Sequence, residues 1–162
     1  MGPVEFNDLS SEEAGRRLLA CFASARWARQ VAGGRPYANL AALLDAAERA
    51  WRDLTPNDWD EAMRGHPRIG EGGGSSPTAS EREQKGVRVA GAAALAQLAD
   101  DNRRYEERFG HVFLISAAGK DADEILADLR ARMDNDPVTE AQVAAAEHRK
   151  IARMRLARML GD

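Results

Sequence analysis

Helix-start signals recur along this sequence, and they constrain its fold more than any other feature. Five residues stand where an N-cap is expected, because each precedes apolar residues at helical spacing. These residues are Ser10, Ser24, Thr55, Asp121 and Asp136. A further helix is predicted to begin at Pro36 and run through Trp51, while Gly65 and Gly110 are predicted to end two helices. Short and medium helices joined by short turns predict an all-α fold.

Two stretches depart from the helical pattern. Val112 to Ile115 are β-branched, aromatic and aliphatic, and too few for a helix, so a buried extended segment is predicted near residues 112–117. Residues 70–79 are rich in glycine and serine, which predicts a mobile internal loop that could act as a lid. One long helix is predicted from Ser80 towards Arg108. The length of the chain predicts a single compact domain over residues 1–162.

Composition excludes several classes of protein. There are 23 basic and 26 acidic residues, and the net charge of -3 disfavours nucleic acid as a partner. No apolar run reaches about 18 residues, so no membrane span is expected. The first residues lack the basic and apolar regions of a secretory signal. The one cysteine, Cys21, is predicted to be a small core residue, and a reducing cytoplasm is the expected location.

The first candidate for chemistry is His66, which precedes Pro67. A residue before proline is biased towards extended geometry, so the imidazole is expected to project from a turn. The ordinary pKa of a histidine side chain is about 6.5, so histidine can act as acid or base near neutral pH. Taken alone, a histidine here is more often a surface or packing residue than a catalytic one.

Ser80, Glu83 and Gln84 form the second candidate, because their spacing puts them on one helix face. An alternative needs no active site: Ser80 and Glu83 have the spacing of a capping box, and so do Thr78 and Glu81. Capping accounts less well for Gln84.

A metal site is not predicted, because His66, His111 and His148 lack the spacing of metal ligands. His148 and Glu147 are expected on a solvated helix face. The basic residues of the last helix are also interpreted as a solvated face, although one inward arginine could bind a carboxylate. These residues are Arg149, Lys150, Arg153, Arg155 and Arg158.

Five segments in chain order carry a family resemblance. They are His66-Pro67-Arg68-Ile69-Gly70, Ser80-x-x-Glu83-Gln84-x-Gly86, Asn102-x-x-Tyr105-x-x-Arg108-Phe109-Gly110-His111, Phe113-Leu114-Ile115 and Lys150-Ile151-Ala152-Arg153-x-Arg155-Leu156. As an ordered set they resemble the 2-oxo-4-hydroxy-4-carboxy-5-ureidoimidazoline (OHCU) decarboxylases, enzymes of urate breakdown. The resemblance implies an all-helical homodimer that forms (S)-allantoin without a metal or organic cofactor. Such a cofactor is not needed, because the ring imine of the substrate accepts the electrons released with carbon dioxide.

The resemblance also implies roles for individual residues. His66 would handle the hydroxyl proton and the protonation that sets the chirality of the product. Glu83 would orient His66 or the substrate hydroxyl and repel the departing carboxylate. Ser80 and Gln84 would hydrogen-bond the ureido and ring amides, and Pro67 would line the pocket.

A second wall of the site is implied further along the chain. Backbone groups from Ile115 to Gly119 would complete the hydrogen bonds of the substrate, and Arg153 or Arg155 would contact a carboxylate. The residues predicted to bind substrate at this second wall are Ile115, Ser116, Ala117, Gly119 and Arg155.

The sequence departs from the family pattern at two places. Many relatives have a cysteine and a basic residue where this chain has Ser116-Ala117-Ala118, so Lys120 or an arginine would have to supply the charge. Val112 replaces a usual proline, which is expected to alter only the turn. A non-catalytic helical interaction domain is the alternative to the enzyme, and a nucleic-acid-binding domain is disfavoured by the acidic balance.

Overall fold

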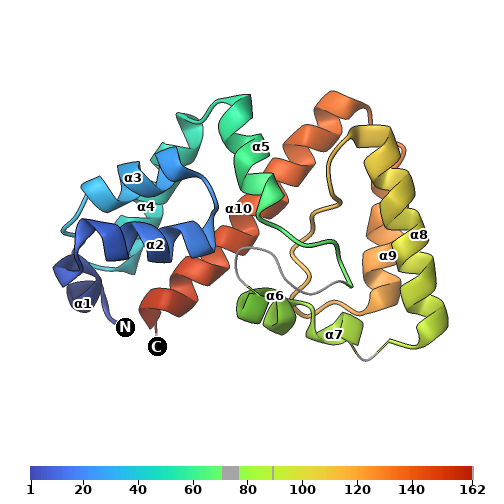
Figure 1. Cartoon of the computed structure of the whole chain (residues 1–162), viewed down its shortest axis with the longest axis horizontal. Coiled ribbons are helices and arrows are strands. Elements are labelled where there is room, and N and C mark those ends of the chain that lie inside the picture. Colours follow the sequence, from blue (N-terminus) through green and yellow to red (C-terminus); the bar gives the residue numbers. More distant parts are fainter. Residues whose placement is uncertain (71–76, 89, 162) are drawn as a thin grey trace. The chain divides into compact units, whose positions relative to one another are not determined.

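The computed structural model describes residues 1–70, 77–88 and 90–161 (Figure 1). Within these residues it contains ten helices and no strand, so the prediction of an all-α fold is confirmed. The helices are α1 (Pro3–Asp8), α2 (Ser11–Cys21), α3 (Ala25–Gly33), α4 (Leu40–Arg52), α5 (Pro56–Arg64), α6 (Pro77–Glu83), α7 (Lys85–Arg88), α8 (Ala92–Phe109), α9 (Ala122–Arg132) and α10 (Pro137–Gly161). None of these helices has both the length and the apolar content that crossing a bilayer requires.

The chain divides into two compact units according to its internal contacts. The first consists of Met1–Gly65 together with Ile151–Asp162, and the second consists of His66–Lys150. Helix α10 therefore contributes residues to both units. The prediction that residues 1–162 form one domain stays a prediction.

Side-chain caps explain where most of the helices begin. At Ser10, Ser24, Thr55, Asp121 and Asp136, a side-chain oxygen accepts a hydrogen bond from the backbone N–H three residues on, at 2.8–3.3 Å. Each cap satisfies an N–H group that has no partner inside its helix. All five predicted helix starts are thus confirmed.

The predicted helix start at Pro36 is wrong. Helix α4 begins at Leu40, where the side chain of Asn39 accepts a hydrogen bond from Ala42 N at 2.9 Å. An asparagine oxygen supplies the N-cap contact, whereas proline only pre-sets its own backbone angle. The predicted end of α8 is confirmed, since Gly110 takes the left-handed conformation of a C-cap with φ of 79°.

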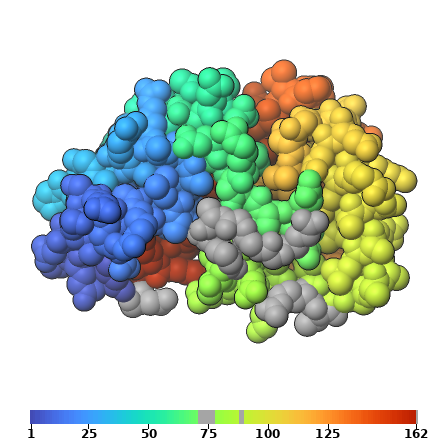
Figure 2. Space-filling model, in the orientation of Figure 1, coloured from blue at the N-terminus to red at the C-terminus, as the bar shows by residue number. Residues whose placement is uncertain are grey.

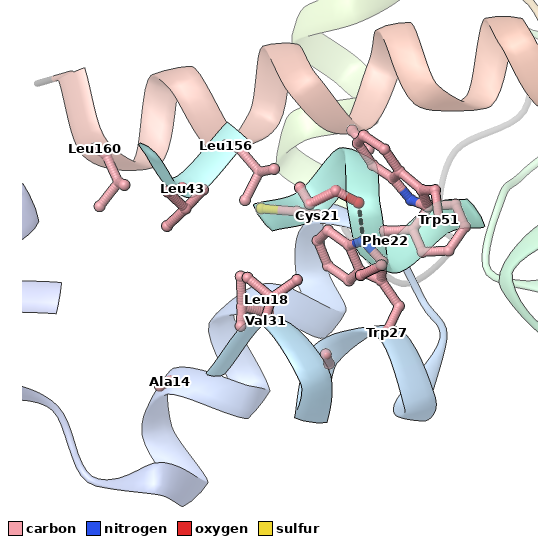
Figure 3. Close-up of a cluster of buried hydrophobic side chains, with 14 of the residues drawn as sticks. Ala14, Leu18, Cys21, Phe22, Trp27, Val31, Leu43, Trp51, Leu156 and Leu160 are labelled. Carbon is pink, nitrogen blue, oxygen red and sulfur yellow. Dashed lines mark hydrogen bonds between the residues drawn. The ribbon is translucent and has the colours of Figure 1, made fainter. Parts of the chain in front are cut away.

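Aromatic side chains form the centre of the first unit (Figure 3). Trp27 and Trp51 stack with ring centroids 5.5 Å apart, and Phe22 packs edge-on against both. The indole N–H of Trp27 donates a hydrogen bond to Ala47 O at 3.3 Å, which satisfies a polar group in the core. Cys21 is also buried here, as predicted.

The second unit has its own apolar cluster, in which α8 and α9 lie side by side (Figure 1). Tyr105 is fully buried, while other residues of α8 form part of the surface shown in yellow in Figure 2. Phe113, Leu114 and Ile115 belong to neither a helix nor a strand and are at most 3% exposed. The buried extended segment is therefore confirmed.

The prediction of one long helix from Ser80 towards Arg108 is wrong, because this stretch folds as α6, α7 and α8. A Cβ atom on Gly86 would lie 2.2 Å from the backbone oxygen of Lys120, so α7 approaches that backbone as only glycine allows. Gly91 has the extended backbone of the N-cap of α8, with φ of -68° and ψ of 163°. The predicted loop over residues 70–79 lies mostly outside the described residues.

Candidate active site

A short loop follows α5 and carries His66 and Pro67, both half-buried. Helix α8 anchors this loop through Arg68, whose Nε and Nη2 donate to the two carboxylate oxygens of Glu106 at 2.6 and 3.1 Å. Asn102 Nδ2 donates to the carbonyl of Ile69 at 3.3 Å. Contacts on successive residues fix the loop backbone, as the predicted role of His66 requires.

The imidazole of His66 contacts a second histidine on α10. The Nε2 atoms of His66 and His148 lie 2.7 Å apart, which is hydrogen-bond distance, and the two ring planes are inclined by 77°. His148 is fully buried, with an exposed fraction of 0%. The expectation that His148 lies on a solvated face is therefore wrong.

Ser80 and Glu83 are both buried in α6, at 4% and 7% exposure. Since α6 begins at Pro77, Ser80 is not an N-cap and Glu83 is the last helical residue. The capping-box interpretation of both residues is wrong, because proline at the first helical position already starts the helix. A carboxylate at the C-terminal end of a helix interacts unfavourably with the helix dipole. Stabilisation of α6 through its dipole is therefore not the reason for a glutamate at position 83.

Gln84 connects α6 to the loop that carries His66. Its side-chain oxygen accepts a hydrogen bond from Gly70 N at 2.9 Å. The amide nitrogen of the same side chain can donate to a ligand, since a glutamine offers both kinds of group.

The extended segment forms a further part of the same unit. Ile115 and Ala117 are buried, Ser116 is half-buried, and Gly119 is exposed with φ of 78°. The N–H of Ser116 donates to Glu147 Oε2 at 3.2 Å. Glu147 therefore holds the extended segment, while the next residue of α10 contacts His66.

Direct contacts bring four separate segments of the second unit together. Gln84 binds the loop at Gly70, α7 packs against Lys120 at the end of the extended segment, and α10 contacts both His66 and Ser116. An imidazole, a buried carboxylate, a hydroxyl and an amide on these segments can exchange protons with a polar ligand and hydrogen-bond it.

Lys120 is one of the residues predicted to replace the basic side chain that many relatives carry near Ala118. Its Nζ atom donates to Asp128 Oδ2 at 2.5 Å. The hydrogen bond to this carboxylate raises the pKa of Lys120, so the side chain stays cationic and is held towards α9. Binding of the substrate by Lys120 stays a prediction.

Arg155 belongs to the first unit, where it is 6% exposed and its Nη1 donates to Ala20 O at 3.3 Å. It is the inward arginine that the sequence allowed for, and its contact with substrate stays a prediction. His111 is half-buried beside the ring of Tyr105. In the described part of the chain, no group of three or more His, Cys, Asp or Glu residues could hold a metal ion.

His148 and Glu147 are the residues that the sequence prediction missed. One signal could have located His148, because Ala144 and Ala152 lie one turn before and one turn after it. All three share a buried helix stripe, with exposed fractions of at most 1%. No comparable signal marks Glu147, whose partner is a backbone N–H.

Comparisons with known proteins identify similar sequences. Residues 7–157 match the family model described as OHCU decarboxylase. The chain is 33% identical to the 2-oxo-4-hydroxy-4-carboxy-5-ureidoimidazoline decarboxylase of Amia calva, over 80% of this chain and 77% of that protein. It is 30% identical to the uric acid degradation bifunctional protein TTL of Arabidopsis thaliana, over 88% of this chain. The match spans only 46% of that longer protein.

Solved structures are similar as well. The crystal structure of OHCU decarboxylase in the presence of (S)-allantoin has a TM-score of 0.80 and 30% identity, covering 91% of this chain and 99% of that chain. The crystal structure of (S)-allantoin synthase shares the fold with a TM-score of 0.76 at 19% identity. It covers 99% of this chain and 54% of that chain.

Proposed function

The chain belongs to the OHCU decarboxylase family, a family of carboxy-lyases, and on this premise we propose that it converts OHCU to (S)-allantoin in urate degradation. In this reaction the bond between the ring carbon and the carboxylate breaks, and its electron pair moves towards the adjacent imine. Carbon dioxide leaves and the imine nitrogen takes up a proton from solvent, while the hydroxyl proton is removed and a proton is added to the carbon that bears the ureido group.

The observation that most supports the proposal is the grouping of four of the five family motif segments, from His66 to Ile115, within one unit. His66 is held on a loop that α8 fixes, and Gln84 ties this loop to α6. In the proposed mechanism the His66 imidazole takes the hydroxyl proton and delivers the proton that sets chirality. Its half-buried position supports this role, because proton transfer needs both access to the substrate and limited contact with water.

Glu83 and Ser80 have proposed roles on the substrate side. A carboxylate of 7% exposure can orient a hydroxyl by accepting its proton in a hydrogen bond, and its charge disfavours a neighbouring carboxylate. Repulsion of this kind is relieved when carbon dioxide leaves as a neutral molecule. Ser80 and Gln84 hydrogen-bond the ureido and ring amides, Pro67 lines the pocket, and the backbone of residues 115–119 completes the set.

The alternative of a non-catalytic interaction domain depended on a structural explanation for Ser80 and Glu83. Capping was that explanation, and it does not apply to a helix that begins at Pro77. The enzyme proposal assigns both buried polar residues a role in binding and orienting the substrate.

The test uses freshly generated OHCU, with absorbance to follow its loss and optical rotation to identify the allantoin enantiomer. The wild-type protein is expected to accelerate the loss and to give one enantiomer. His66→Ala should lower kcat by about 10²–10⁴-fold, which is the usual contribution of a general acid or base. His111→Gln is the matched control and should keep most of the activity. Full activity of folded His66→Ala protein would refute the role of His66.

The resemblance also supports assembly as a homodimer in the cytoplasm, with a small-molecule substrate and no nucleic-acid or membrane partner. A single buried cysteine agrees with a reducing compartment. Light scattering on the purified chain tests the assembly, because a monomer has a mass of 17.7 kDa and a dimer has twice that mass. A monomer mass at all concentrations would refute the dimer.

A further inference from the structure

The contact between His66 and His148 joins two imidazoles through the same ring atom. Their Nε2 atoms are 2.7 Å apart, and the ring centroids are separated by 4.5 Å. A hydrogen bond of this kind contains one proton, so one Nε2 donates and the other accepts. The tautomers of the two rings are therefore linked, and both cannot carry a proton on Nε2.

This linkage determines which atom of His66 is used in the proposed reaction. Because Nε2 faces His148, Nδ1 is the ring nitrogen that exchanges a proton with the substrate. If His148 accepts, then Nδ1 of His66 has a lone pair and acts as the base. When Nδ1 gains the proton, the resulting imidazolium still donates from Nε2 to His148, so the charge keeps a hydrogen-bond partner.

We infer that His148 is a positioning residue for the proposed decarboxylation, because it orients the imidazole of His66 and fixes the nitrogen that transfers the proton. This inference rests on the proposed function and extends it. His148 is suited to the role as a neutral acceptor, since moving a charge into a fully buried position is costly.

The setting of His148 on α10 is itself fixed by other contacts in the second unit. Glu147 accepts the hydrogen bond from Ser116 N, which fixes the helix against the extended segment. Two turns earlier on the helix, Glu140 is bound by Arg132 and Tyr105 in the core. Both contacts restrict rotation and sliding of α10, so the Nε2 atom of His148 has a defined position.

Two substitutions separate the hydrogen bond from the volume of the side chain. His148→Leu keeps an apolar volume and removes the bond, whereas His148→Gln retains a group that can donate or accept. We expect His148→Leu to lower kcat by about 10–100-fold with little change in KM, the size typical of losing a partner that orients a functional imidazole. His148→Gln is expected to recover most of this loss, and His111→Gln to behave as wild type.

Nitrogen-15 spectra of the imidazole rings provide a second readout, which a purely structural role would not change. The chain has only 3 histidines, so their ring signals can be assigned by substitution. In the wild type, the fraction of His66 that carries a proton on Nε2 and the corresponding fraction of His148 should add up to one, because the two rings share one proton. In His148→Leu, which removes the hydrogen bond, the tautomer populations of His66 should shift.

The possible outcomes distinguish this inference from the proposed function. Equal kcat for folded His148→Leu protein and the wild type would overturn the inference, while inactive His66→Ala protein would leave the proposed function intact. Wild-type protein without decarboxylase activity would instead refute the proposed function, and the role of His148 with it. If His148→Leu does not fold, wild-type kcat of folded His148→Ala protein with unchanged His66 tautomers would also overturn the inference.

Discussion

Replacing Arg132 with methionine is expected to destabilise the second unit far more than loss of a surface charge would. Arg132 donates to Glu140 Oε1 from Nε at 2.8 Å and from Nη2 at 2.5 Å. Its Nη1 atom donates to Leu114 O at 2.8 Å, within the extended segment. Glu140 has no exposed surface, so water cannot replace the lost partner.

The expected size follows from the burial of this ion pair. Removing one partner of a buried pair typically costs about 3–5 kcal/mol, because the other charge is left without compensation. Glu140 keeps hydrogen bonds from Tyr105 Oη at 2.5 Å and Asn135 Nδ2 at 3.0 Å, which favours the lower part of the range. At roughly 2–4 °C per kcal/mol for a chain of this length, the melting temperature should fall by about 6–20 °C.

The loss of stability caused by Arg132→Met should also depend on pH. Burial raises the pKa of Glu140, but hydrogen bonds from Arg132, Tyr105 and Asn135 outweigh it and hold the pKa below the ordinary 4.5. The wild type therefore has this stabilisation above pH 4.5 and loses it as the pH falls through the lowered folded-state pKa. Without Arg132, burial should raise the pKa instead, so the variant loses stability as the pH rises.

Urea unfolding followed by circular dichroism, at about pH 7 and about pH 5, measures both effects. The penalty for Arg132→Met should be largest near pH 7 and smaller at the lower pH. The matched control is Arg103→Met, since Arg103 pairs with Asp100 on the surface and should contribute only about 0–1 kcal/mol. Equal penalties for the two variants, or the same Arg132→Met penalty at both pH values, would refute the reasoning.

Two further predictions concern the same unit. Gly86→Ala places a Cβ atom 2.2 Å from the Lys120 oxygen, so urea unfolding should show that the free energy of unfolding falls by about 1–3 kcal/mol, and activity should fall as well. The control is Gly15→Ala, whose Cβ meets no atom within 4 Å, so its effect on stability should be neutral or stabilising. An unaffected Gly86→Ala variant would contradict this. Burial, and then the hydrogen bond to Glu140, raises the pKa of Tyr105 above its ordinary 10.0, so stability should fall above pH 10.0. Tyr105→Phe should weaken this alkaline dependence, to which Tyr37 also contributes because burial raises the pKa of Tyr37. An alkaline dependence equal to that of the wild type would contradict the assignment.

Helix boundaries were predictable where the deciding contact is local. A cap such as Ser24 or Asp121 reaches only three residues along the chain, so its signal is contained in a short window of sequence. The break between α6 and α7 at Gln84 was not predictable in this way. Gln84 contacts Gly70, and Gly86 in α7 lies close to the Lys120 backbone; both partners are remote in the sequence.

The candidate site was predictable in its residue types and less so in its contacts. The motif residues at positions 66, 80 and 83 were identified from the sequence, and their burial in one unit agrees with that identification. Ser80 and Glu83 also have the spacing of a helix cap, and only the position of Pro77 excludes that interpretation. His148 was missed because its partner is 82 positions away and its basic neighbours indicated a solvated face.

The division of α10 between the two units has a consequence for synthesis of the protein. The unit with the candidate site is one uninterrupted stretch, His66–Lys150, and all of its residues leave the ribosome before Ile151. The unit that starts the chain needs Ala152, Leu156 and Leu160 for its core, so it cannot be completed until those residues emerge. Domains usually mature from the N-terminus onward during translation, but here residues 1–65, although made before residues 66–150, are expected to reach their final packing after them.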